Sequence, residues 1–150
     1  MGNGSSAGTY PYTIAAVVYL NNLTATKAII GPTANAGLEI RSETSGAIGM
    51  ASADTAYIGG SSTTISSGSW HLLVYMVDSS TYSFQIDGIA AGSGSHSVSL
   101  GASNFQMGAQ KTNEEYFDGI IGEVQIYSSL FGSTDLSGLH TYAVNKWATP

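Results

Sequence analysis

The stretch from Trp70 to Ile89 carries the clearest pattern of apolar and polar positions in the chain. From Trp70 to Val77 both alternating sets of residues are apolar, broken by one histidine, which is typical of a central strand covered on both faces. Turn-forming residues follow, and then apolar and polar residues alternate as in a half-buried return strand. Because Asp87-Gly88 tolerates the positive φ angles of a tight hairpin turn, a third strand is predicted from Ile89. The stretch therefore predicts an antiparallel meander.

The segment from Thr13 to Leu20 is also apolar on both faces and predicts a second central strand. Gly59 to Gly68 is almost entirely Gly, Ser and Thr and is interpreted as a loop or an edge strand, and Gly92 to Ser97 as a turn. Shorter strands are predicted at 27–30, 38–42, 47–51, 56–58, 98–100, 105–109 and within 117–127.

The end of the chain changes to a helical period. Apolar residues at 136, 139, 143, 144 and 147 lie at helical spacing, and Ser133, Thr134 and Asp135 are available as an N-cap. One short amphipathic helix is predicted to end the chain with its apolar stripe on the sheets. Trp70 and Trp147 are expected in the core.

Composition supports an all-β class. Only 9% of the 150 residues are charged, and 22 Ser, 14 Thr and 19 Gly suit short strands joined by tight turns. The length corresponds to one domain, predicted at 12–150, after a flexible Gly/Ser-rich lead-in at 1–11. The chain has no cysteine, which excludes disulfides and thiolate metal sites.

The balance of charge excludes two classes of partner. A net charge of −6 with four scattered basic residues argues against a nucleic-acid-binding face. No apolar run approaches the ~20 residues that span a bilayer, so no membrane insertion is expected.

Catalytic chemistry has weak candidates. Glu39 and Glu43 could serve as general acid and base in glycoside cleavage, but Arg41 between them favours an exposed ladder in which both acids stay ionised. The three histidines are far apart in sequence and predict no zinc site, and His71 is expected to be packed or hydrogen-bonded within its strand. We therefore expect no enzymatic activity.

Several motifs resemble those of concanavalin A-like, laminin-G-like jelly-roll domains. They are the segment from Phe117 to Trp147 with its GEV strand and terminal KW, the WHL strand start at Trp70, the IDG hairpin at Ile86 and the early strand at Tyr12–Leu20. The resemblance implies two antiparallel sheets packed as a jelly-roll sandwich. The chain departs from it in having only a short Gly/Ser-rich segment before its first strand, and Gly122 where many relatives carry Asp.

Two polar loops could recognise a ligand. Sugar binding needs an aromatic face for the C–H surface of the ring and carboxylate or amide groups for the hydroxyls. The alternative interpretation is that the tyrosines pack at strand ends and the polar residues are solvated. The candidate ligand-binding residues are Asn113, Glu114, Glu115, Tyr116, Asp54 and Tyr57.

No cofactor is expected. Calcium binding is the one metal-binding alternative, because the chain offers oxygen ligands of the kind that calcium takes. Asp118 and Asp54 are the candidate calcium ligands, although Asp residues in turns are commonly turn formers.

The composition and the resemblance together favour a non-catalytic surface module. Few charges, abundant Ser/Thr/Gly and a flexible lead-in suit a domain displayed on a larger assembly, similar to jelly-roll domains of bacteriophage heads and tail fibres. The hypothesis is a virion structural protein, homo-oligomeric, at the virion surface or extracellular, whose partners are glycans and other virion proteins. The alternatives are a carbohydrate-binding module of a secreted or cell-surface protein and, third, a glucan hydrolase.

Overall fold

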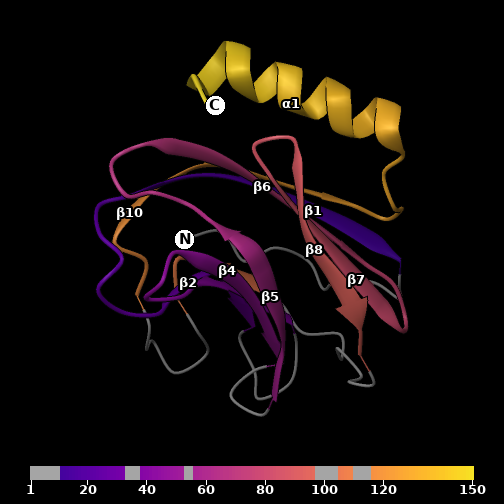
Figure 1. Cartoon of the computed structure of the whole chain (residues 1–150), viewed down its shortest axis with the longest axis horizontal. Coiled ribbons are helices and arrows are strands. Elements are labelled where there is room, and N and C mark those ends of the chain that lie inside the picture. Colours follow the sequence, from indigo (N-terminus) through magenta and orange to yellow (C-terminus); the bar gives the residue numbers. More distant parts are fainter. Residues whose placement is uncertain (1–10, 33–37, 53–55, 97–104, 110–115) are drawn as a thin grey trace.

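The described residues fold into two antiparallel sheets and one helix (Figure 1). The computed structural model describes residues 11–32, 38–52, 56–96, 105–109 and 116–150, with only the backbone described at 52, 56 and 57. The first sheet has the order β10 (Gly119–Tyr127), β1 (Tyr12–Leu20), β6 (Trp70–Val77), β7 (Thr81–Ile86) and β8 (Ile89–Ser95). The second sheet has the order β5 (Ala56–Thr64), β4 (Ala47–Ser52), β3 (Leu38–Ser42), β2 (Lys27–Pro32) and β9 (Phe105–Met107). The predicted all-β sandwich is confirmed.

The central strands β1 and β6 are apolar on both faces because each face is covered by a different layer. One face, with residues such as Ile14 and Leu73, packs in the core between the two sheets. The opposite face packs against the helix α1 (Ser133–Trp147), which lies along the outer side of the first sheet (Figure 1). The outer cluster of buried residues consists of Ala15, Val17, Leu72, Val74, Leu139 and Ala143.

The helix begins one residue after Gly132, whose N–H donates to the Asp135 carboxylate at 3.0 Å. Leu139 and Ala143 are buried as predicted, whereas Val144 is exposed, so its predicted place in the apolar stripe is wrong. Trp70 and Trp147 are partly buried between helix and sheet, with ring centroids 4.8 Å apart.

Two glycine-rich stretches form strands, as parts of β5 and β8. The edge-strand alternative for the stretch from Gly59 is confirmed as far as Thr64, whereas the turn predicted from Gly92 is wrong as far as Ser95. The Tyr82 ring explains both, because a Cβ at Gly59 or Gly94 would lie 1.9 or 2.6 Å from its hydroxyl oxygen. The glycines make room for this ring and therefore contribute no alternating apolar pattern. The strand predicted at 98–100 lies outside the described residues.

The Asp87-Gly88 hairpin is confirmed, with φ angles of 52° and 78° at the two turn residues. These angles are those of the tight turn that suits the twist of paired strands. Within the described part of the chain, no helix is long and apolar enough to cross a membrane.

Candidate functional site

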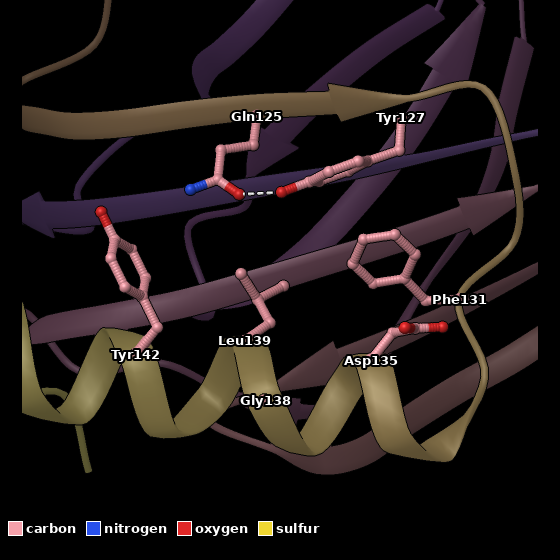
Figure 2. A pocket seen from close by; sticks show the side chains of 7 residues that line it. All are labelled: Gln125, Tyr127, Phe131, Asp135, Gly138, Leu139 and Tyr142. Atoms are coloured by element: carbon pink, nitrogen blue, oxygen red, sulfur yellow. Dashed lines mark hydrogen bonds between the residues drawn. The ribbon is translucent and has the colours of Figure 1, made fainter.

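A groove of about 330 Å³ lies between β10 and α1 on the outer side of the first sheet (Figure 2). Side chains from the strand, from the helix and from the segment that joins them project into it. We call this feature the β10–α1 groove; it is lined by Gln125, Tyr127, Phe131, Asp135, Gly138, Leu139 and Tyr142.

The periods of the two elements bring these side chains together. On β10, Val124 packs towards the core between the sheets, so the alternate residues Glu123, Gln125 and Tyr127 face outwards. On α1, residues 135, 139 and 142 lie on one side of the helix, because spacings of three and four residues return to the same face. Since β10 is an edge strand, the groove opens to solvent beside it.

One wall of the groove is aromatic. The Tyr127 and Phe131 rings lie 4.4 Å apart between centroids, tilted by 51°. Phe131 is held in place through its N–H, which donates to the buried Thr13 hydroxyl at 3.2 Å. The same hydroxyl donates to the Ser129 carbonyl at 2.7 Å, so the segment between β10 and α1 is fixed at two points.

A relay of hydrogen bonds runs along the outward face of β10. The Tyr127 hydroxyl donates to the Gln125 side-chain carbonyl (Figure 2), and the Gln125 amide donates to Glu123 Oε1 at 2.5 Å. An amide nitrogen has two protons and a phenol oxygen can also accept, so both groups retain capacity for a hydroxyl ligand.

Glu123 joins the strand to the helix. Its Oε2 atom accepts from Lys146 Nζ at 2.9 Å, from the Tyr142 hydroxyl at 2.8 Å and from the indole of Trp147 at 3.4 Å. The hydrogen bonds from Lys146 and Gln125 lower the pKa of Glu123 to about 2. Hydrogen bonds to Tyr142 and Glu123 raise the pKa of Lys146 in turn. Glu123 is therefore a fixed anion and unsuited to donate a proton as a general acid.

The two acids considered as a catalytic pair, Glu39 and Glu43, both lie beside Arg41. Glu39 is fully buried, so its predicted exposure is wrong, whereas Arg41 between the two acids is confirmed. The Arg41 guanidinium lies 3.6 Å from Glu39 Oε1 and 2.8 Å from Glu43 Oε1. A buried carboxylate is stabilised by such a cation, which compensates part of its lost hydration.

His71 is hydrogen-bonded within the fold, as expected. Its Nδ1 lies 2.7 Å from Asp87 Oδ2, and its Nε2 lies 3.1 Å from the Ser66 hydroxyl and accepts from the Ser66 N–H at 3.3 Å. The other Asp87 oxygen accepts the Leu72 N–H at 2.8 Å. Both Ser66 groups thus converge on one nitrogen, and the cluster fastens the 66–71 segment to the hairpin at Asp87.

Most of the loop residues predicted to bind ligand lie outside the described residues: Asp54, Asn113, Glu114 and Glu115. Tyr116 is exposed, and the backbone of Tyr57 belongs to β5, paired with Ala51. The structure therefore leaves the predicted loop site as a prediction. The residues of the β10–α1 groove were missed, although the outward row of Glu123, Gln125 and Tyr127 was visible in the sequence.

The predicted calcium ligand Asp118 takes part in a network of amides. Its two carboxylate oxygens accept from the side-chain amides of Asn21, at 2.8 Å, and of Asn22. The described residues contain no group of three or more His, Cys, Asp or Glu side chains able to hold a metal ion. At Gly122, where the family resemblance led us to expect Asp, a Cβ would lie 2.8 Å from the Trp147 ring, so a carboxylate does not fit beneath the docked helix.

The comparisons with known proteins agree with this architecture. A family model described as the concanavalin A-like lectin/glucanases superfamily matches residues 2–137. No curated protein sequence matches the chain.

Solved structures with this fold include carbohydrate-binding domains. Domain 4 of the extracellular arabinanase AbnA from Geobacillus stearothermophilus, in complex with arabinotriose, has a TM-score of 0.74 at 20% identity, covering 92% of this chain and 71% of that one. The CBM40 domain of the Ruminococcus gnavus IT-sialidase, bound to α2,3-sialyllactose, has a TM-score of 0.72 at 13% identity, covering 93% and 94%. A Bacteroides ovatus chain has a TM-score of 0.71 at 14% identity, and this chain covers 42% of its length. At these identities the likeness shows the fold.

Proposed function

The chain belongs to the concanavalin A-like lectin/glucanases superfamily, and on that premise we propose that it is a non-catalytic module that binds a neutral glycan in the β10–α1 groove. The observation that carries the proposal is the combination of an aromatic wall with a polar relay in one groove. Tyr127 and Phe131 offer ring surface to the C–H face of a sugar. Gln125 and the Tyr127 hydroxyl lie beside them and can hydrogen-bond sugar hydroxyls.

The electrostatics of the groove favour a neutral ligand. Asp135 lies in the groove and Glu123 beside it, and the nearby ammonium of Lys146 is paired with Glu123. The whole chain carries a net charge of −6. Around the groove, the described residues present two carboxylates and one ammonium that is already paired, so a sialic or uronic acid would meet net repulsion.

Two observations support a binding role over catalysis. Glu123 is ionised at all but very acidic pH, and the two acids on the second sheet share Arg41. A retaining or inverting glycosidase needs one carboxyl whose pKa is raised so that it can protonate the leaving group.

The experiment is a binding panel with the whole chain, measured by isothermal titration calorimetry. The probes are arabinotriose, xylotriose, cellotriose and maltotriose as neutral ligands and α2,3-sialyllactose as the anionic one. We expect at least one neutral trisaccharide to bind, sialyllactose not to bind, and Tyr127→Ala to weaken binding at least roughly tenfold through loss of the stacked ring.

Tyr116→Ala is the matched control, because it removes an exposed tyrosine that belongs to the predicted loop site. Loss of binding in Tyr116→Ala with full binding in Tyr127→Ala would move the site to that loop. Binding of sialyllactose, or of no glycan, would contradict the proposal. Incubation of the same glycans with the chain should leave them uncleaved.

The setting predicted from the sequence, a homo-oligomeric module at a virion surface or outside the cell, remains a proposal. It is supported by the low content of charged residues and the high content of Ser, Thr and Gly. Mass-resolved sizing of the purified chain separates the alternatives. A stable oligomer that ignores glycan and calcium favours an assembly component, whereas a monomer that binds glycan favours a module of a secreted or cell-surface protein.

A further inference from the structure

A second hollow, of about 460 Å³, lies on the same outer side of the first sheet as the β10–α1 groove. Phe131 lines both features, so the two lie next to each other at this residue. We call this second feature the β6–β8 hollow; its lining includes Met76, Thr81, Ser83, Ser93, Leu130 and Phe131.

Strand register creates the floor of the β6–β8 hollow. Met76 on β6 pairs with Ser83 on β7, which pairs with Ser93 on β8, so the three residues form one row across the sheet. Paired residues of neighbouring strands point to the same face. The helix packs over β1 and β6 through the outer cluster, to which β7 and β8 contribute no buried residue. Two serines beside the helix therefore leave this part of the face hollow.

The chemistry of the β6–β8 hollow matches that of the groove. The hydroxyls of Ser83 and Ser93 can donate and accept hydrogen bonds, and Met76 and Leu130 supply apolar surface. The Thr81 hydroxyl donates to Asp78 Oδ2 at 2.9 Å and can still accept. Asp78 also lines the hollow; it accepts from the Ser80 N–H at 2.8 Å and the Thr81 N–H at 2.7 Å, which lowers its pKa. The hollow thus offers hydroxyl groups and a carboxylate that stays ionised, a combination that suits a neutral polyhydroxylated ligand and repels an anion.

Phe131, at the boundary between the groove and the hollow, is held in place by its backbone and by its ring. Its backbone N–H is bound to the buried Thr13, and its ring packs on Tyr127. A linear glycan that stacks on this aromatic pair in the groove would place its next sugar units over the serine row.

We propose that the ligand is an oligosaccharide that crosses Phe131, with one sugar unit in the β10–α1 groove and a further unit in the β6–β8 hollow. This inference rests on the proposed function and adds the second subsite and the direction of the glycan across the sheet. Because the second contact is intramolecular once the first has formed, affinity should rise with the length of the glycan.

The test is the dependence of affinity on length, measured by isothermal titration calorimetry with the whole chain. The probes are the one-, three- and six-unit members of the arabinose, xylose, glucose β1,4 and glucose α1,4 series. We expect the six-unit member of the binding series to bind at least roughly tenfold more tightly than the shortest member that binds. Ser83→Phe, which fills the β6–β8 hollow, should remove this difference and leave the shortest ligand unaffected.

Thr63→Phe is the matched control, the same kind of change at an exposed position on β5 of the second sheet, and it should preserve the length dependence. Equal affinity for short and long glycans in the wild-type chain would overturn the second subsite while leaving the proposed function standing. If Ser83→Phe keeps the full difference in affinity between the six-unit and the shortest glycan, the second subsite is likewise overturned and the proposed function stands. Failure of every series to bind would overturn both. The wild-type comparison needs no variant, and thermal unfolding of Ser83→Phe shows whether it is folded.

Discussion

Glu123 is the residue that links the chemistry of the groove to the stability of the fold. Its carboxylate on β10 accepts hydrogen bonds from three side chains of α1, and its neighbour Gln125 extends the network towards the aromatic wall. The same contacts hold the anion and dock the helix. Glu123 therefore helps to keep the groove in one shape, and its lowered pKa makes this carboxyl unsuited to act as a general acid.

The pH dependence of this contact follows from the lowered pKa of Glu123. A carboxyl whose folded-state pKa is about 2, below its ordinary 4.5, adds stability at pH values above about 4.5 and loses it as the pH falls towards 2. Because the pair is partly exposed and screened by salt, we expect Lys146→Met to lower the free energy of unfolding only slightly at pH 6. The cost should shrink towards zero at pH 2, measured as the difference in urea unfolding between the two proteins.

Lys27→Met is the control for this change, since it alters net charge equally from β2 of the second sheet. A carbon-13 titration of the Glu123 carboxyl should also show its pKa rising in Lys146→Met but not in Lys27→Met. An unchanged pKa in Lys146→Met would contradict the contact as described.

At the scale of single residues, the sequence correctly predicted structural roles that depend on neighbouring residues in the chain. Asp87-Gly88 forms the expected tight turn, and Arg41 lies between its two acids. Glu39 was misplaced because alternation tells which face of a strand a residue occupies, and the outer face of β3 was assumed to be exposed. Burial of that face depends on the tertiary structure, which alternation does not report.

At the scale of elements, the docking of α1 onto the first sheet depends on the absence of a side chain at Gly122. A Cβ there would lie 2.8 Å from Trp147 Cη2 and 3.0 Å from Trp70 Cζ3. We expect Gly122→Ala to push the two indoles apart and to cost about 1–3 kcal/mol, as overpacking does. Urea unfolding gives the cost, and tryptophan fluorescence and near-ultraviolet circular dichroism report the loosened indoles.

Gly138→Ala, on the docked helix α1, is the matched control for Gly122→Ala. A Cβ there meets nothing within 4 Å, and alanine is the better helix former, so this variant should gain about 0.5–1 kcal/mol. Equal effects of the two substitutions would contradict the packing of Trp70 and Trp147 against Gly122.

The elements themselves were predictable to different degrees. β1 and β6 were evident because each is buried on both faces, between the second sheet and α1. β5 was only partly predictable from the sequence. Gly59 leaves room for the Tyr82 ring and therefore gives no apolar signal of a strand. The helix was predicted from its spacing of apolar residues, but not all of its predicted buried residues are buried. Val144 is exposed because the contact between the helix and the sheet is narrow.

At the scale of the whole molecule, the β10–α1 groove could not be read from the sequence. Its outward row on β10 and its helical residues are separate patterns, each of which also fits a solvated face. They form a groove only because α1 folds back beside β10, the strand that precedes it in the chain. The packing of Ala143 against the first sheet sets the distance between the helix and the sheet. The jelly-roll class was predictable, whereas the position of the site depends on this tertiary contact.

The sandwich as a whole explains why the outer side of the first sheet is the surface to test. The helix covers β1 and β6 and leaves a groove on the side of β10 and a hollow on the side of β7 and β8. Phe131 borders both. One face of the molecule thus carries aromatic rings, hydroxyls, an amide and ionised carboxylates, the groups that recognise neutral sugars.

The central claim is that a neutral glycan binds on this face. The most direct measurement is a two-dimensional ¹H–¹⁵N NMR titration of the whole chain with the neutral oligosaccharide that binds in the calorimetric panel. The account predicts chemical-shift changes centred on Gln125, Tyr127, Phe131 and Tyr142, with the amide of Tyr116 unchanged. Changes confined to Tyr116 and its neighbours, with the groove residues unmoved, would contradict it.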